Sequence, residues 1–318
     1  MNKKQFSELM NRIKLLQPKQ LDSLLEAAKR VRHEPTPAKI IDTQFAVNSA
    51  CPRCACDSIR KWGLESGIQR YRCNGCNRTF NALTGTPMAR LRKKDLWLDY
   101  SEVLRQGLSL TKAAEHCGID RTTAFRWRHR FLTTPKKNQP CCSGIAEADA
   151  TYFLESFKGK KVHHRKSRKR GGVAQQRGLS AEQIPVLVVR DRERRTCDAV
   201  LQERAAKGVK ASIERYIAPD AVLCIDGERA LKKFAKTCGF AFEVLGPKQR
   251  RGRDKAFHLQ NVNAYHHRLK EWMMPFRGVA TKYLPNYLGL RRLHERDVNT
   301  PTAFLSEATM RIHNAQRN

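Results

Sequence analysis

The stretch 144–154, GIAEADATYFL, is typical of a β-strand, and QIPVLVVRDRE at 183–193 contains the continuous apolar run of a buried strand. Two further strands are predicted at AVLCID (221–226) and FAFEVLG (240–246). Helical patterns lie between and after them, at 207–217, at 228–239 with Gly239 as its end, and at 258–274 with Pro275 as its end. Strands and helices that alternate in this way predict a mixed α/β domain with helices packed on a sheet.

Upstream of this region the patterns are different. Residues 1–33 repeat apolar positions at helical spacing, with Pro18 between two helices, and 34–50 has two prolines and no period, which indicates a linker. Short strand-like runs among cysteines fill 51–80, helical patterning returns over 88–132, and a second linker is expected at 133–144. We therefore expect an α+β multidomain protein. Its predicted parts are a helical N-terminal segment and linker (1–47), a zinc ribbon (48–87), a helix-turn-helix (88–135), the mixed α/β domain (136–295) and a C-terminal tail (296–318).

The composition is strongly basic. Among 318 residues there are 62 Lys and Arg against 30 Asp and Glu, which gives a formal charge of +32. Such a charge predicts a polyanionic partner such as nucleic acid. The hydrophobic content of 40% is enough for a sizeable core and argues against wholesale disorder. No apolar run suggests a membrane span or a secretory signal, so we expect a cytoplasmic, nucleoid-associated protein without membrane contact.

Four cysteines are paired at metal-ligand spacing. Cys51 and Cys54 form one C-x₂-C pair, and Cys73 and Cys76 form another, 18 residues further along. This spacing predicts a tetrahedral Zn²⁺ site with all four positions filled, and therefore a structural rather than a catalytic metal. Cys56 is an alternative to Cys54, because it forms a C-x-C with it.

Residues 109–132, SLTKAAEHCGIDRTTAFRWRHRFL, have the pattern of a helix-turn-helix. Ala114 precedes Gly118 by four residues, as a tight turn between two helices requires. An ordinary helical hairpin with a basic face is the alternative. The side chains expected to contact DNA from the second helix are Arg121, Thr122, Thr123, Arg126 and Arg128.

Two aspartates are candidates for a catalytic metal site. Asp149 lies within the first predicted strand of the α/β domain, and Asp226 ends the buried strand VLCI. Carboxylates at such positions are costly unless they are paired or bind a metal, and two of them on adjacent strands would hold Mg²⁺. Asn263 and Lys270 lie seven residues apart on a predicted helix, about 700° of rotation, so they share one face. Taken singly, each of these residues is also common in turns, caps and helices.

The order of these motifs, with EADATYFLESFKGKK, VLCIDGERAL and HLQNVNAYHHRLKEWM, resembles bacterial insertion-sequence transposases of the type called fifteen-ninety-five, over about residues 48–293. The resemblance implies a ribonuclease-H-like catalytic domain with an acidic triad of Asp, Asp and Glu or Asn, followed by Lys. Carried over, these are Asp149, Asp226, Asn263 and Lys270, with 36 residues between Asp226 and Asn263. Asn263 replaces the commoner Glu, Ala150 departs from the acidic residue often found there, and Asn261 is a fallback ligand.

Two basic clusters flank the candidate site. Residues 158–170 contain eight Lys or Arg and no acid, and 248–255 precede the helix of Asn263. Such runs are often simply solvated, but beside a carboxylate site they are expected to bind the phosphates of the DNA backbone. The residues expected to do so are Arg165, Lys166, Arg168, Lys169, Arg170, Arg250, Arg251 and Arg253.

Together these features predict a DNA transposase that binds the terminal inverted repeats of an insertion sequence. Mg²⁺, with Mn²⁺ as a substitute, would support strand cleavage and transfer at Asp149, Asp226 and Asn263. Element ends and target DNA are the expected partners, and a homodimer on DNA is expected because both ends must be cut in one complex. The rival hypothesis is a zinc-ribbon and helix-turn-helix regulator without catalysis, and a third is an inactive transposase.

Overall fold

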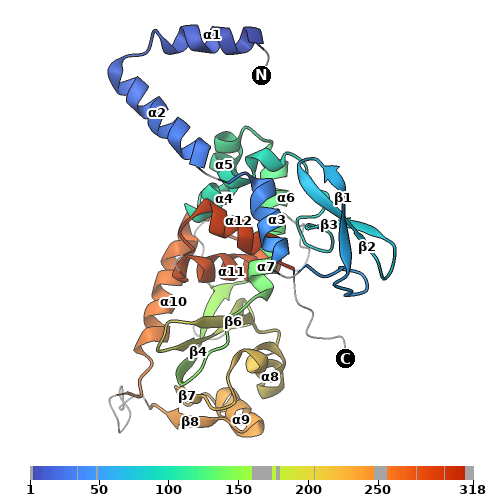
Figure 1. Ribbon diagram of the computed structural model, residues 1–318. Coiled ribbons are helices and arrows are strands. Elements are labelled where there is room, and N and C mark those ends of the chain that lie inside the picture. The colour runs from blue at the N-terminus through green and yellow to red at the C-terminus, as the bar shows by residue number, and fades with distance from the viewer. Residues whose placement is uncertain are drawn as a thin grey trace.

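The computed structural model describes most of the chain and has an elongated shape (Figure 1). Three helices come first, and two of them project away from the rest of the molecule. Their bounds are α1 (Lys3–Ile13), α2 (Pro18–His33) and α3 (Pro37–Ala46). The structure describes residues 3–33, 35–47, 49–159, 174–176, 180–203, 205–246, 256–276, 278–296 and 298–311.

Helix α3 corrects the expectation of a linker at 34–50. Thr36 is its N-cap and accepts a hydrogen bond from the amide of Lys39, and Pro37 occupies the first turn, where proline is well tolerated. The two prolines that suggested a linker therefore mark the start of a helix. Ile40, Ile41 and Phe45 form its buried side, and α3 packs against the small sheet that follows.

The zinc-ribbon region forms a three-stranded antiparallel sheet. Its strands are β1 (Ile59–Glu65), β2 (Ile68–Cys73) and β3 (Thr79–Asn81), in the order β1-β2-β3. Tyr71 of β2 lies against Phe45 of α3 and Phe80 of β3, with ring centroids 4.8 and 5.8 Å away. This aromatic cluster joins the small sheet to the body of the molecule.

A group of helices connects the ribbon to the larger domain. A 3₁₀ turn (Lys94–Leu96) leads into α4 (Trp97–Arg105), α5 (Leu110–Cys117), α6 (Arg121–Phe131) and α7 (Thr133–Lys137). The predicted linker at 133–144 thus begins with a short helix, in which Thr134 and Pro135 are buried. Helical structure at 88–132 is confirmed from Lys94 onward.

The larger domain contains a five-stranded mixed sheet in the order β6-β5-β4-β7-β8. Strands β4, β5 and β6 are antiparallel, whereas β4, β7 and β8 run parallel. The predicted strands at 144–154, 183–193, 221–226 and 240–246 are confirmed. The observed bounds are β4 (Ile145–Leu154), β5 (Gln183–Asp191), β6 (Thr196–Val200), β7 (Val222–Ile225) and β8 (Ala241–Val244).

Helices cover both faces of this sheet. On one face α8 (Ala206–Ile213) and α9 (Arg229–Cys238) pack through Ile213, Leu231 and Phe234. On the other face α10 (Gln260–Met273) packs through Val262, Tyr265 and Leu269 against the valines of β5. The alternating side chains of β4 therefore face two different helix layers, and Asp149 is on the face covered by α10.

The C-terminal helices return to the N-terminal half (Figure 1). They are α11 (Leu284–Glu295) and α12 (Pro301–Thr309). Phe304, Leu305 and Ala308 of α12 are buried in the same core as α3, α4 and α6. The expectation of a C-terminal tail from 296 is therefore wrong over 301–309, where Thr300 caps a helix with Pro301 in its first turn.

Candidate functional site

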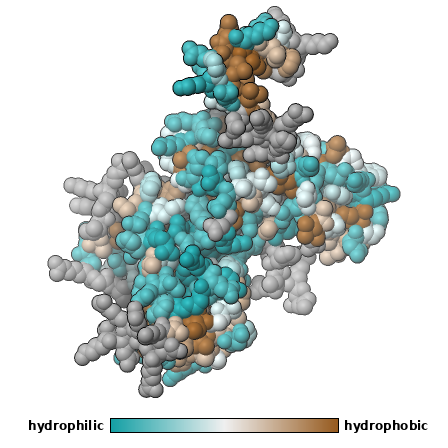
Figure 2. Space-filling model, turned by 60° about the vertical axis from the view of Figure 1, so that its left-hand side comes forward, coloured by the Kyte–Doolittle hydropathy of each residue, from teal (hydrophilic) through white to brown (hydrophobic). Residues whose placement is uncertain are grey.

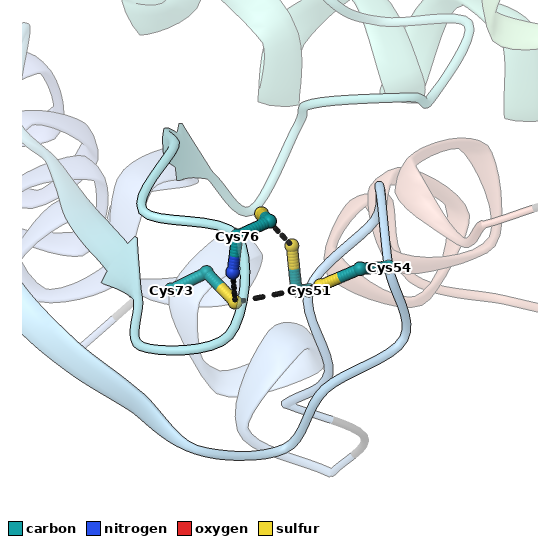
Figure 3. A group of neighbouring side chains, drawn as sticks. All are labelled: Cys51, Cys54, Cys73 and Cys76. Carbon is teal, nitrogen blue, oxygen red and sulfur yellow. Dashed lines mark hydrogen bonds between the residues drawn. The ribbon is translucent and has the colours of Figure 1, made fainter.

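The four paired cysteines converge beside the small sheet (Figure 3). Cys51 Sγ lies 3.8 Å from Cys76 Sγ, and Cys54 Sγ lies 3.5 Å from Cys73 Sγ. All four sulfurs lie within 4.8 Å of one another. A tetrahedron of thiolates at the usual Zn–S distance has edges of about 3.8 Å, so the arrangement fits a Zn²⁺ ion.

Local hydrogen bonding favours the thiolate form at Cys73, whereas the pKa of Cys54 is raised to about 12. The amide of Cys76 donates to Cys73 Sγ at 3.5 Å, and this contact is the main cause that lowers the pKa of Cys73 to about 6. Cys54, and not the alternative Cys56, belongs to the cluster. The Cys56 thiol is directed instead to the carbonyl of Ser58, 3.9 Å away.

Helices α5 and α6 form the expected helix-turn-helix. Ser109 caps α5 by accepting a hydrogen bond from the amide of Lys112, and Gly118 ends it with a φ of 58°. That left-handed conformation is one that glycine adopts without strain. The amide of Ile119 then donates to the carbonyl of Ala114 at 3.0 Å, which closes the turn.

One side chain of α6 is not available to DNA. Arg128 is 1% exposed, and its guanidinium donates to the carbonyl of Leu108 and lies 3.5 Å from the Tyr287 hydroxyl. The expectation that it contacts DNA is therefore wrong, because it faces the core of the molecule. Arg121, Thr122 and Arg126 are exposed, and Thr123 is half-buried.

Apart from Lys158 and Gly159, the two predicted basic clusters lie outside the described residues. This applies to each of their candidate DNA contacts: Arg165, Lys166, Arg168, Lys169, Arg170, Arg250, Arg251 and Arg253.

The larger sheet brings the two candidate carboxylates together. Strands β4 and β7 run parallel with Ala148 opposite Ile225, so the next residues, Asp149 and Asp226, are neighbours where β7 ends. Gly227 follows with a φ of 92°, which turns the chain away from the sheet after Asp226. Asp226 Oδ1 accepts a hydrogen bond from the amide of Glu228 at 3.0 Å.

The environment of Asp149 disfavours its charge. The pKa of Asp149 is raised to about 6, chiefly by burial and also by the carboxylates of Asp226 and Glu228, while the amide of Ala150 and the charge of Lys270 act in the opposite direction. Desolvation and like charges both favour the protonated acid. A bound divalent cation would reverse this preference, so the donor set fits an oxygen-liganded metal such as Mg²⁺.

Helix α10 faces these carboxylates with polar side chains. His266 Nδ1 lies 3.6 Å from Asp149 Oδ2, and burial lowers the pKa of His266 to about 4, so a neutral imidazole lies beside the acid. Asn263 and Lys270 are exposed, one turn on either side of His266. The only group of three or more His, Cys, Asp or Glu with convergent ligand atoms in the described residues is the four cysteines. Asn263 stays a prediction as the third ligand of the metal.

A buried glutamate behind the site was not among the sequence candidates. Glu147 is fully buried and contacts Arg192 and His258, the latter with 3.1 Å between His258 Nδ1 and Glu147 Oε1. Its Oε2 accepts a hydrogen bond at 2.8 Å from the amide of Val262 in the first turn of α10. Glu147 thus fixes the start of the helix that carries Asn263. An acid two residues before Asp149 in a predicted strand was the available signal, because such residues share one face.

The matches to known families follow the same division of the chain. Residues 142–290 match the ISXO2-like transposase domain family, and residues 101–137 match a homeodomain-like domain family. The chain therefore contains an ISXO2-like transposase domain. Its ISXO2-like domain includes the whole five-stranded sheet, both candidate aspartates and α10, and the homeodomain-like match covers α5 and α6.

A protein of a transposable element is also similar to most of this chain. An uncharacterized protein in the transposable element ISH50 of Halobacterium salinarum is 26% identical over 262 residues, which cover 79% of this chain and 86% of the relative. The similarity therefore extends beyond the ISXO2-like domain. Across the described residues, none of the helices has both the length and the apolar character needed to cross a bilayer.

Proposed function

We propose that this protein is a transposase that binds the terminal inverted repeats of an insertion sequence and catalyses Mg²⁺-dependent strand cleavage and strand transfer. The observation that carries the proposal is the pairing of Asp149 with Asp226 on neighbouring parallel strands, beside the polar face of α10. The ISXO2-like match supports the same reading.

The division of labour follows the predicted domains. We assign a ribonuclease-H-like catalytic domain to 136–295. The five-stranded sheet supports this assignment, because β6, β5 and β4 are antiparallel and β7 and β8 continue from β4 in parallel. The zinc ribbon (48–87) and the helix-turn-helix (88–135) would bind the element ends. The exposed face of α6, with Arg121, Thr122 and Arg126, is suited to phosphates and base edges.

In the proposed mechanism Asp149, Asp226 and Asn263 hold Mg²⁺. Such a bound metal would supply activation of a water or 3′-hydroxyl nucleophile and stabilisation of the leaving oxygen. His266 supports Asp149 from the buried side. Lys270, on the same face of α10 and close enough to lower the pKa of Asp149, would hold a phosphate oxygen near the scissile bond. The four cysteines would hold a structural Zn²⁺, which has no part in the chemistry.

Cleavage of a labelled element end tests the proposal. The zinc-loaded protein is incubated with duplex DNA that carries the inverted repeat and flanking sequence, in Mg²⁺ or Mn²⁺, and strand products are resolved by size. We expect specific nicking at the element boundary that is lost in Asp226→Asn, a change that removes the charge with little change in shape. Tight binding by the wild type without cleavage in either metal would favour the DNA-binding regulator. Two element ends held in one complex would support the expected homodimer.

A further inference from the structure

The hairpin formed by β1 and β2 has an outer face that the fold does not use. All residues of β1 after Ile59 are exposed, and β1 is an edge strand. Ser66 and Gly67 connect the strands with φ values of 48° and 78°. Two positive φ values in a two-residue loop are typical of the tight turns that match the natural twist of a hairpin, so this projecting element is well defined.

Two arginines face each other across this hairpin. Arg60 and Arg72 are directly paired in the register of β1 and β2. Like charges in opposite positions destabilise a sheet. Within the described part of the chain neither arginine forms an ion pair, and Glu65 of the same strand pairs instead with Arg70, 3.7 Å from Oε2 to Nε. The free hairpin therefore carries two adjacent guanidinium groups without a counter-charge.

An exposed tryptophan holds the two arginines in place. The guanidinium carbons of Arg60 and Arg72 lie 5.1 and 4.9 Å from the ring centroid of Trp62. Trp62 is 43% exposed and belongs to none of the buried clusters formed by the described residues. It precedes Gly63, at a break in strand register where φ is 79°. A bulge of this kind re-aims a side chain, and here it places the indole with both cations.

The core of the ribbon is built without this group. Tyr71, Phe45 and Phe80 form the aromatic contacts between the sheet and α3, and the cysteine cluster secures the loops. Trp62 and the two arginines thus stabilise little of the fold, while they keep two cations at a fixed spacing on a projecting surface. That spacing suits an anionic, repetitive ligand.

We propose that Arg60, Trp62 and Arg72 form a binding surface for the sugar–phosphate backbone of duplex DNA. A phosphate between the guanidinium groups would replace their repulsion with charge-assisted hydrogen bonds, and the indole edge would pack against the deoxyribose. The arginines lie over the indole ring that a base of single-stranded DNA would need for stacking, and this favours the duplex backbone. The inference rests on the proposed function and adds a second DNA contact, separate from α6.

Binding measurements with the full-length, zinc-loaded protein test this surface. The test variant is Arg60→Gln with Arg72→Gln, and the matched control is Lys61→Gln with Arg78→Gln, which removes two exposed charges from the same ribbon. The probe is a short fluorescent duplex of arbitrary sequence, titrated over a range of salt concentrations. Each phosphate contact contributes about 0.9 to the slope of log K against log salt, so the test variant, which loses the one phosphate held between the two arginines, should lower the slope by about 1. The control variant should lower the slope by less than half as much. Trp62→Ala should weaken binding and lower the slope by less than the test variant does.

The outcomes separate the hypotheses. Equal slopes for the test and control variants would overturn the proposed binding surface, because binding would then depend only on the total positive charge of the ribbon. Tighter binding of the matching single strand than of the duplex, lost in Trp62→Ala, would overturn the choice of ligand. An unchanged zinc content per chain shows that the variants are folded. The cleavage assay tests the proposed transposase function separately. Binding to the DNA backbone requires neither cleavage nor a specific sequence, so the two proposals can fail independently.

Discussion

At the residue scale, some basic side chains of α6 are exposed and one is buried, although the sequence gives no sign of the difference. Arg126 is exposed, whereas Arg128 is buried and donates to the carbonyl of Leu108. Helical spacing alone places Arg128 at the edge of the apolar face. The contacts that bury it come from Phe276 and Tyr287, more than a hundred residues away, and no local pattern could predict them.

This division predicts opposite effects for two neighbouring substitutions. Arg126→Ala should weaken DNA binding and leave the free energy of unfolding within about 0.5 kcal/mol of the wild type, as is usual at exposed positions. Arg128→Ala should lower the free energy of unfolding by roughly 2 kcal/mol, because it opens a cavity and leaves the carbonyl of Leu108 without its partner. Chemical denaturation and fluorescence anisotropy measure the two effects. Equal stability losses for both variants would contradict the buried position of Arg128.

Asp149 should make metal binding depend on pH. Its pKa is raised to about 6 from an ordinary value of 3.8, so the folded, metal-free protein binds this proton more tightly than the unfolded chain does. Metal binding must displace that proton, and the apparent Mn²⁺ affinity should therefore fall as the pH drops below about 6, by up to tenfold per pH unit. Calorimetric titration measures it. Asp149→Asn should bind more weakly and without this pH dependence, and a wild-type affinity that is flat between pH 5 and pH 7 would contradict the assignment.

The site could be predicted in outline but not in full. Asp149 was identified within a predicted strand and Asp226 at a strand end, and both from the resemblance; the sheet register places them side by side. Glu147 and His266 were not identified, because their roles depend on α10 crossing the face of β4. A sequence shows which side chains share a face of one strand, but it does not show which helix covers that face.

At the element scale, local signals predicted four strands of the larger sheet and most helices, but they missed β6, α7 and α11 as well as α3 and α12. The bounds of β4, β5, β7 and β8 follow from their apolar runs, and Gly239 ends α9 with a φ of 74° as expected. Helices α3 and α12 were missed because both are short and begin with proline. Their helical state is supported by burial against each other and against α4, so tertiary packing outweighs weak local propensity.

The zinc ribbon should depend on one cysteine of an adjacent pair and not on the other. Cys54→Ser removes a sulfur of the cluster and should abolish stoichiometric zinc, whereas Cys56→Ser should retain it. In comparable peptides zinc binding contributes roughly 10–16 kcal/mol to folding, so its loss should also disorder the ribbon. Metal content per chain and the near-ultraviolet dichroism of the Phe45, Tyr71 and Phe80 cluster measure these effects. Zinc retained by Cys54→Ser and lost by Cys56→Ser would reverse the ligand assignment.

At the scale of the whole molecule, α11 joins the two halves. Arg292 forms a buried ion pair with Asp198 of β6, and it also donates to the carbonyls of Pro135 and Lys136 at 2.8 and 3.1 Å. Leu290 and Leu293 are buried in the core that contains α4 and α6, while Leu284 and Leu288 are buried against α10. One helix therefore contributes to the cores on both sides of the boundary.

Loss of the Arg292 side chain should weaken both halves together. Arg292→Ala leaves Asp198 buried without its partner, and breaking such a pair typically costs about 3–5 kcal/mol. Differential scanning calorimetry should show a lower melting temperature for the whole chain, and combining Arg292→Met with Asp198→Asn should recover part of the loss. Unchanged melting in Arg292→Ala would show that α11 does not stabilise the junction.

Under the proposed function, the contacts at the start of α11 would affect where DNA is cut. The aromatic ring of Tyr283, just before α11, stacks on His129 of α6 with centroids 3.8 Å apart, and Asn286 contacts the same histidine. Helix α6 and the two carboxylates are thus held in one frame. In the proposed function, this frame would set the distance from the recognised bases to the cut bond. Adding about five base pairs, half a turn of DNA, between them would present the opposite side of the duplex to Asp149 and Asp226.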